Sequence, residues 1–251
     1  MTFADRIADA DRLREEINQH RPLKREALKQ LREYFRVGLT WASNALEGNS
    51  LTETETKVVL EDGITIGGKP LKDHYEAIGH AEAFDYLQTL VKRTEIAERD
   101  ILKLHKLFYY RIDQACAGHY RKQNVVVTGT DFIFPPPSQL KKLMTEFTAE
   151  IPALRSEKHP IEFAALLHLR LVTIHPFVDG NGRTARLLMN LALLQAGYPV
   201  TIIPPVLRSD YLSTVRQGNS GNSEPFVTLL SNMVWESQRD YLRLLQNLER
   251  K

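Results

Sequence analysis

The chain has 251 residues, a formal net charge of +2 and a single cysteine, with 43% hydrophobic and 25% charged residues. This length allows one large domain or a domain with an appendage, and the composition is ordinary for a soluble globular protein. So small a charge predicts no nucleic-acid or membrane partner, and Cys116 alone excludes an intrachain disulfide. Neither a signal peptide nor a membrane helix is recognisable, so we expect a cytoplasmic protein.

The spacing of apolar residues predicts a chain that is helical almost throughout. Residues 64–70 contain Gly67, Gly68 and Pro70 and are expected to form a loop. Residues 160–174 are apolar on nearly every side, which places that helix in the middle of the core. The expected helices are, in chain order, about 4–20, 23–47, 51–62, 72–92, 97–113, 138–154, 160–174, 183–195, 209–217 and 224–249.

One segment departs from the helical pattern. Val125, Val126 and Val127 precede the turn sequence Thr-Gly-Thr-Asp, and the apolar residues 132–134 follow it. This pattern predicts a β-hairpin within 120–137, which three successive prolines then end. A lone hairpin is marginally stable in water, so it should lean on the helices and leave an edge free for a peptide. The expected fold class is all-α with a small β-hairpin flap.

The segment 175–186, His-Pro-Phe-Val-Asp-Gly-Asn-Gly-Arg-Thr-Ala-Arg, connects two apolar helices. A loop that enters a helix N-terminus presents free backbone N–H groups and the positive end of the helix dipole. Gly180 and Gly182 let a phosphate approach the main chain closely. Arg183 and Arg186 are three residues apart, so both can lie on one face of the first turn and bind phosphate oxygens.

Two further groups complete this segment. Asp179 offers a hard oxygen ligand for Mg²⁺, and His175 is the one group there that can accept a proton near neutral pH. Together the residues indicate phosphoryl or nucleotidyl transfer. The alternative is that His175 caps a helix and that the arginines are surface charges, but such a set within twelve residues favours the catalytic interpretation.

The segment resembles the signature of the Fic family, His-Pro-Phe-x-Asp/Glu-Gly-Asn-Gly-Arg-x-x-Arg, with every defined position filled. The resemblance extends from about Thr40 to about Trp235 and includes Gly118-His-Tyr-Arg121 and Arg208-Ser-Asp-Tyr211. Fic proteins are mainly AMP transferases that modify Tyr, Thr or Ser hydroxyls. The resemblance therefore implies a protein adenylyltransferase (AMPylator) that uses ATP with Mg²⁺, or Mn²⁺ in its place, and docks its protein substrate on the flap by strand addition.

The resemblance also implies roles for individual residues. His175 would deprotonate the target hydroxyl, and Asp179 would hold Mg²⁺ between the α- and β-phosphates. The backbone of Gly180, Asn181 and Gly182 would cradle the phosphates, with Asn181 at the α-phosphate. The remaining nucleotide contacts are implied for Arg183 at the β- and γ-phosphates, Arg186, Tyr211 near the adenine and Asn219 near the ribose. A core tyrosine and a loop asparagine are the alternatives for the last two.

Ser43-Asn-Ala-Leu-Glu47-Gly48 resembles the inhibitory motif of a Fic subgroup, on a helix of about 40–48. Ser43 and Glu47 are one helical turn apart, and Gly48 would end the helix. The resemblance implies that Glu47 pairs with Arg186, blocks the γ-phosphate and inhibits the enzyme, and that it also takes part in removing AMP. The alternative is an exposed glutamate before a C-cap glycine.

The expected organisation is N-terminal helices at 1–62, a catalytic core at 63–223 and a C-terminal helix at 224–251. Fic proteins often form dimers, and the apolar residues of the N-terminal helices would serve a homodimer. A competing hypothesis is a nucleotide-binding regulatory partner that has lost catalysis, against which the intact His175 and Arg183 argue.

Overall fold

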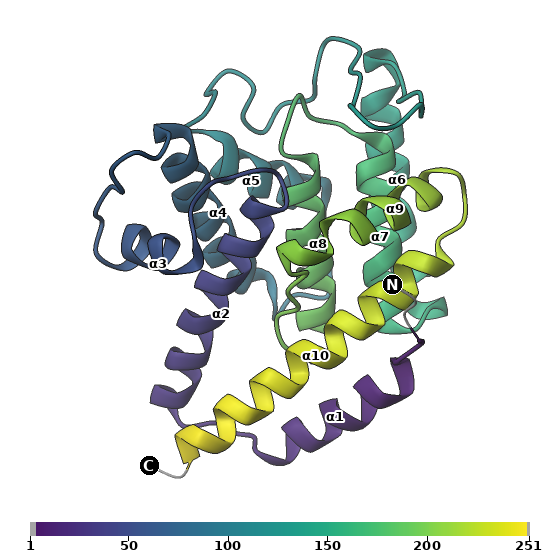
Figure 1. Cartoon of the computed structure of the whole chain (residues 1–251). Helices are drawn as coiled ribbons and strands as arrows, with labels where there is room; N and C mark the ends of the chain where they lie inside the picture. The colour runs from purple at the N-terminus through teal and green to yellow at the C-terminus, as the bar shows by residue number, and fades with distance from the viewer. Residues whose placement is uncertain (1–3, 250–251) are drawn as a thin grey trace.

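A computed structural model describes residues 4–249, so residues 1–3 and 250–251, at the ends of the expected units 1–62 and 224–251, lie outside the described residues (Figure 1). The described chain forms ten α-helices and one short 3₁₀-helix. These are α1 (Ile7–Gln19), α2 (Arg25–Ala45), α3 (Glu53–Glu61), α4 (Leu71–Leu90), α5 (Glu98–Tyr109), α6 (Pro137–Glu157), α7 (Pro160–Ile174), α8 (Asn181–Gln195), η1 (Pro205–Leu207), α9 (Arg208–Asn219) and α10 (Glu224–Glu249).

Helices α7 and α8 form the centre of the molecule (Figure 1). Helices α4 and α5 pack against α8, while α6 and α10 pack against α7, and α1 runs along α10. Leu167 and Leu171 of α7 and Leu187 and Leu191 of α8 are fully buried. This enclosure explains why the sequence of α7 is apolar on nearly every side.

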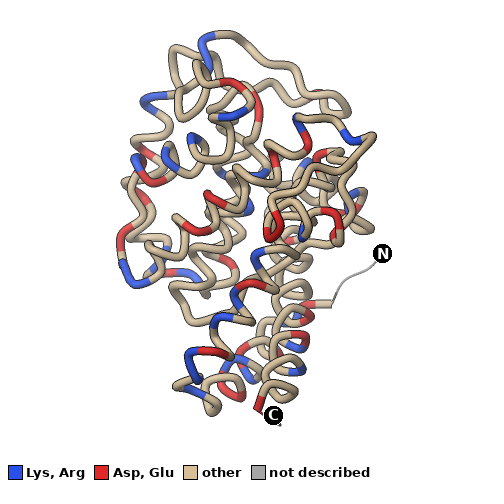
Figure 2. The backbone as a smooth tube through the Cα atoms, turned by 90° about the vertical axis from the view of Figure 1, so that its left-hand side faces the viewer, with Lys and Arg blue, Asp and Glu red and all other residues tan. Residues whose placement is uncertain are grey.

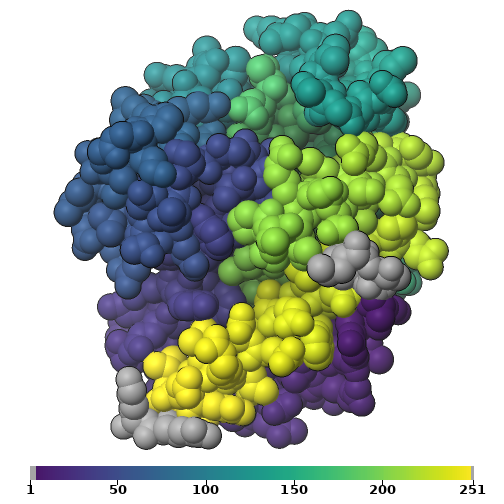
Figure 3. All heavy atoms as spheres, in the orientation of Figure 1, coloured from purple at the N-terminus to yellow at the C-terminus, as the bar shows by residue number. Residues whose placement is uncertain are grey.

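Helix α2 brings the N-terminal part of the chain to the central pair. It contacts α3, α4, α8 and α10, and it ends at Ala45. The following helix, α3, starts with a capping box in which Thr52 and Glu55 satisfy each other's backbone N–H groups. In the space-filling view, α3 (blue) and α9 (yellow-green) flank an area where α2 (purple) reaches the surface (Figure 3).

The predicted β-hairpin at 120–137 is wrong in its strands. A turn forms at Thr128 and Gly129, and Gly129 has the positive φ of 85° that such a turn requires. Among the described residues, however, the chain contains no β-strand, and 124–127 and 131–134 make no backbone hydrogen bonds to each other. Two isolated strands without a third strand do not gain enough to pair, and the flap is an open, extended loop.

Lys and Arg positions alternate with Asp and Glu positions along the described backbone (Figure 2). This distribution matches the small net charge of the chain. Within residues 4–249, no helix combines the length and apolar character that crossing a bilayer requires.

Candidate active site

His175 ends α7 in a left-handed conformation, with a φ of 50°. Its Nδ1 lies 3.3 Å from the carbonyl oxygen of Val172, which can only accept, so Nδ1 carries the proton and Nε2 keeps a free lone pair. Burial lowers the pKa of His175 to about 4. The imidazole is therefore neutral near pH 7 and able to accept a proton at Nε2.

The loop after His175 is folded by Asn181 and His105. The amide of Asn181 accepts a hydrogen bond from the Phe177 N–H and donates one to the Phe177 carbonyl, both at 2.9 Å. The His105 ring stacks on Phe177 with centroids 3.7 Å apart. His105 accepts from the Gly118 N–H at Nδ1, so its Nε2 donates to the Asp179 carbonyl at 3.0 Å. In this structure the Asn181 side chain thus shapes the loop.

Asp179 is the candidate metal ligand. Its side chain is 42% exposed, and Oδ1 accepts hydrogen bonds from the Gly180 N–H at 2.6 Å and from Arg183 Nη2 at 3.3 Å. No cluster of three His, Cys, Asp or Glu residues that could hold a metal occurs in the described part of the chain. One accessible carboxylate fits Mg²⁺ that takes its other ligands from phosphates and water, and it does not fit a metal held by protein alone.

Arg183, in the first turn of α8, contacts Glu76 and Phe108 in addition to Asp179. Nη1 lies 2.8 Å from Oε1 of Glu76 in α4, and the guanidinium lies over the Phe108 ring of α5 at 4.3 Å. The other oxygen of Glu76 accepts a hydrogen bond from Asn49 at 2.9 Å. Arg183 is 2% exposed, and its Nε finds no hydrogen-bond partner among the described residues. A buried N–H group of a cation that has no partner can donate a hydrogen bond to a bound anion.

Arg186 meets both residues that the sequence assigns to inhibition. Its Nε donates to Ser43 Oγ at 3.0 Å, and its Nη2 donates to the Ser43 carbonyl at 2.8 Å and to Glu47 Oε1 at 2.7 Å. Nη1 donates to Tyr211 Oη at 2.8 Å. Arg186 is 2% exposed, whereas 35% of the Glu47 side chain is exposed, so the pair opens toward solvent on the glutamate side.

Glu47 lies over the first turn of α8. A Cβ added at Gly182 would overlap with Glu47 Oε1, so the carboxylate occupies space that only a glycine leaves free. Burial alone would raise the pKa of Glu47, but the charges of Arg186 and Arg183 outweigh burial and the pKa lies below its ordinary value. The N-terminus of α8 thus already holds an anion, supplied by the chain itself.

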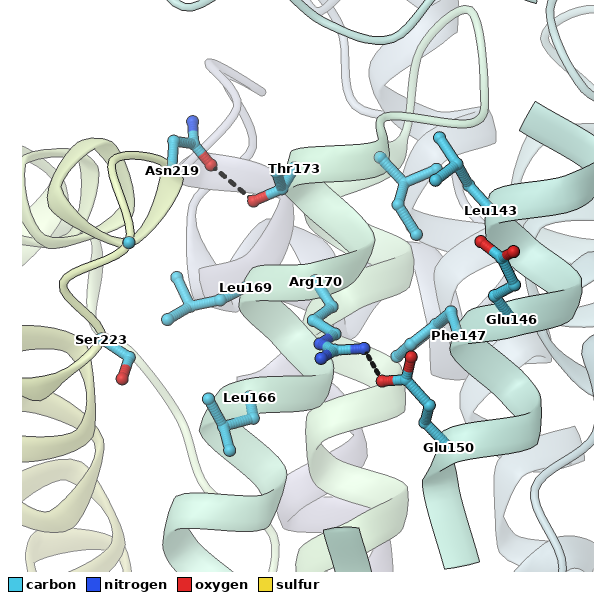
Figure 4. Close-up of a pocket in the computed structure, with 13 residues that line it drawn as sticks. Leu143, Glu146, Phe147, Glu150, Leu166, Leu169, Arg170, Thr173, Asn219 and Ser223 are labelled. Atoms are coloured by element: carbon cyan, nitrogen blue, oxygen red, sulfur yellow. Dashed lines mark hydrogen bonds and ion pairs between the residues drawn. The ribbon is translucent and has the colours of Figure 1, made fainter. Parts of the chain in front are cut away.

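Tyr211 and Asn219 lie in different surroundings. Tyr211 is buried, and its hydroxyl accepts from Arg186 and donates to Nε2 of His168, 2.9 Å away, which makes His168 a core histidine. Asn219 Oδ1 accepts from Thr173 Oγ1 at 2.9 Å, at the edge of a cavity of about 510 Å³ between α6, α7 and the α9–α10 connection (Figure 4). No residue of 175–186 lines this cavity.

Three residues that organise the site were not assigned roles from the sequence: Glu76, His105 and Arg121. His105 follows Leu104 and precedes Phe108 on the buried face of α5. A polar side chain at such a position must find a partner inside, and this is the one signal that the sequence offered. Their partners are backbone carbonyls and an arginine from distant segments, and no local pattern identifies those.

Comparisons with known proteins agree with this geometry. The Fic/DOC family model matches residues 95–193, which include the loop and most of α8. Proteins called protein adenylyltransferase Fic from Drosophila grimshawi and Drosophila melanogaster are each 39% identical over 202 residues, covering 80% of this chain. The chain spans only 41% of the length of these relatives.

Solved structures extend the similarity to nearly the whole chain. Fic-1 from C. elegans has 30% sequence identity and a TM-score of 0.87, covering 96% of this chain and 72% of its own. A Fic domain containing signaling protein from Bacteroides thetaiotaomicron has 30% identity and a TM-score of 0.86, covering 96% of this chain and 97% of its own. The helical frame, the loop geometry and these similarities together show that the chain belongs to the Fic/DOC family.

Proposed function

We propose that the chain transfers AMP from ATP to a hydroxyl group of a protein. One observation carries this proposal: two features lie next to each other in one loop. The first is a neutral His175 with a free Nε2, and the second is a helix N-terminus that holds an anion. The unpaired Nε of Arg183 adds a donor for a phosphate oxygen. Relatives at 39% identity carry the name protein adenylyltransferase, which supports the same reaction.

In the proposed reaction the target hydroxyl gives its proton to His175 Nε2. The hydroxyl oxygen forms a bond to the α-phosphorus, and the bond from that phosphorus to the bridging oxygen of the β-phosphate breaks. Pyrophosphate leaves with the bond electrons. The N–H groups at the start of α8 and the guanidinium of Arg183 stabilise the charge that develops on it. Asp179 would hold Mg²⁺, which neutralises phosphate charge when bound.

We further propose that Glu47 inhibits this reaction. Its carboxylate occupies the space over Gly182 and engages Arg186, the arginine that lies deepest at the start of α8. A phosphate group and a carboxylate carry charge of the same sign and cannot share this position. The partial exposure of Glu47 gives the pair a route by which to open.

Removal of AMP from a modified protein is the second candidate activity. Glu47 lies near Asp179 of the loop, close enough that the charge of Asp179 opposes, without cancelling, the lowering of the Glu47 pKa by the two arginines. Two carboxylates beside one phosphate site could orient a water molecule for attack on the phosphorus. Glu47 would then inhibit the forward reaction and serve the reverse one.

The flap is the proposed docking site for the protein substrate. Val126 is 96% exposed and Ile133 is 89% exposed, while Val125 and Val127 are partly buried. This alternation is that of an extended chain whose unpaired backbone can add a strand from a partner. For a homodimer, the exposed Leu28 and Tyr34 on α2 are the candidate contact residues.

The test of AMP transfer uses the Glu47→Gly variant, in which the proposed block is absent. Purified protein is incubated with ATP and Mg²⁺ and its intact mass is measured. We expect a gain of one AMP per modified residue, and no gain in Glu47→Gly/His175→Ala. If Glu47→Gly binds ATP but gains no mass, and labels no protein in a lysate with α-labelled ATP, the chain is a nucleotide-binding partner and the proposal is wrong.

A further inference from the structure

Arg121 lies at the start of the flap and is buried, with 2% of its surface exposed. No carboxylate pairs with it among the described residues, and burial lowers its pKa. An unpaired buried charge is costly, so its donors must be satisfied in another way. All of the hydrogen bonds that Arg121 donates end on backbone carbonyls.

These carbonyls belong to two segments that the proposed reaction must bring together. The backbone N–H donates to Pro176 at 2.9 Å and Nε donates to His175 at 2.8 Å, both in the catalytic loop. Nη1 donates to Gln123 at 2.9 Å and Nη2 donates to Pro135 at 2.6 Å, at the two ends of the flap. The guanidinium is planar and rigid, so its three hydrogen bonds fix the two ends of the flap relative to the backbone of His175.

Both segments depend on such support. The left-handed conformation of His175 is unfavourable for a residue with a side chain, so contacts from outside the loop must hold it. The flap has no strand pairing within the described chain, and the hydrogen bond that its tip accepts from another element runs from Arg216 Nη1 to the Gly129 carbonyl. Phe134, one residue before Pro135, packs its ring 4.4 Å from that of His175.

We propose that Arg121 is a positioning residue that sets the flap and His175 in register, so that a hydroxyl presented on the flap meets Nε2. The statement about the hydroxyl rests on the proposed function, whereas the coupling between flap and loop does not. Lysine cannot replace arginine here, since a single ammonium on a flexible stem cannot reach three carbonyls in fixed directions.

The coupling is tested by hydrogen exchange without nucleotide, comparing Arg121→Lys with wild type. We expect faster exchange at the hydrogen-bonded amides of the two segments, which are Arg121 at the start of the flap and His175 and Phe177 in the loop, with the exchange of α7 and α8 unchanged. The matched control is Arg155→Lys, because Arg155 is a partly buried arginine without a carboxylate partner that donates to Gln195 instead. Unchanged exchange of both segments in Arg121→Lys, or equal effects of the two variants, would overturn the proposal.

The functional part is tested in the Glu47→Gly background by self-labelling with α-labelled ATP and by the Kd for ATP. We expect Arg121→Lys to lower the labelling rate about 100-fold, the loss that a misplacement of about 1 Å produces, with the Kd for ATP nearly unchanged. A matched loss of ATP binding would indicate a general structural role and contradict positioning. Absence of labelling in Glu47→Gly itself would instead count against AMP transfer and leave the exchange result as the test of Arg121.

If Arg121→Lys does not fold, two measurements take its place. The neutral Arg121→Gln retains an amide donor in the same cavity and enters the same exchange comparison. In wild type, the Nε–H resonance of Arg121 is followed by NMR, and its bond to the His175 carbonyl predicts slow exchange with solvent. Exchange of this proton at the rate of an exposed arginine would show that the contact does not form in solution.

Discussion

At the scale of single residues, the site is defined by where each donor and acceptor ends. The loop backbone is hydrogen-bonded by the side chains of Asn181, His105 and Arg121. By contrast, Arg183 has an unpaired Nε and His175 has a free Nε2. The loop is therefore held where its groups have partners, and the unpaired groups are the ones left free to contact a ligand.

Glu47→Gly is expected to raise the initial rate of AMP incorporation about tenfold or more. If the blocked state of wild type is favoured by about 1.4 kcal/mol, about one molecule in ten is open, whereas every molecule of the variant is open. Glu47→Gln keeps the shape but loses the charge, so its rate should lie between those of wild type and Glu47→Gly. Rates are measured with α-labelled ATP at fixed protein concentration.

The matched control for this prediction is Glu33→Gly, the same chemical change at an exposed position of α2. It should leave the rate at the wild-type value. A Glu47→Gly rate that does not exceed that of Glu33→Gly would show that the contact with Arg186 does not limit the reaction.

The residues of the motif were predictable from the sequence because their chemistry is concentrated in one short segment. The pairing of Glu47 with Arg186, more than a hundred residues away, followed from the resemblance alone, and the structure brings these two residues together and adds Ser43 as a further partner of Arg186. Glu76 could not be predicted as the partner of Arg183, because a glutamate on a helix is usually solvated and nothing local marks this one as buried.

At the scale of elements, the close contact between α4 and α5 places α5 against the catalytic loop. A Cβ at Gly79 of α4 would overlap with the carbonyl oxygen of Phe108 and lie 3.0 Å from that of Leu107. Because the two helices approach so closely, α5 can place His105 and Phe108 under the loop. The glycine is required for its lack of a side chain.

Gly79→Ala should therefore force α4 and α5 apart and lower the free energy of unfolding by about 1–3 kcal/mol, the usual cost of overpacking. Gly67→Ala is the control, since a Cβ there meets nothing within 4 Å and the backbone has no positive φ. Urea denaturation followed by circular dichroism compares the two variants. Equal stability of Gly79→Ala and wild type would show that the helices adjust without strain.

The helices were predictable at this scale, and the flap was not. Each expected helix has its counterpart within a few residues, because apolar spacing, prolines and glycines act locally. The apolar runs at 125–127 and 132–134 correctly indicated a non-helical segment with a turn at Gly129. It could not indicate whether the two arms pair, since pairing depends on a third strand or a packed face that the sequence does not specify.

At the scale of the whole molecule, the main hydrophobic core of the described residues extends from Ala10 in α1 to Leu245 in α10. Four histidines, His80, His105, His168 and His175, lie in or beside this core, and burial lowers the pKa of each one. The values are about 3 for His80 and about 4 for His105 and His175, against 6.5 for an exposed histidine.

Between pH 6.5 and about 4, the unfolded chain binds protons at these histidines that the folded chain does not bind. Stability must then rise with pH across this window and fall as the pH is lowered through 6.5. Each such histidine costs about 1.4 kcal/mol one pH unit below its unfolded pKa. We expect the Tm to decrease from pH 7 to pH 5.5.

His80→Asn reports on one of these groups, because an amide can keep the contact of Nδ1 with Thr40 and does not titrate. The variant should show a shallower decrease of Tm with pH than wild type, whatever its Tm at pH 7. A Tm that is constant or rises on acidification would mean that these side chains are protonated in the folded protein.

The placement of Glu47 has a consequence for how its contact responds to solution conditions. A carboxylate attached to α2 competes for the start of α8 as an intramolecular ligand, and its effective concentration is set by the tether and not by the amount of protein. Dilution cannot release it, and a dissolved anion displaces it only when the anion's concentration relative to its own Kd outweighs the internal contact. Any change that moved the end of α2 away from α8 would lower the effective concentration itself.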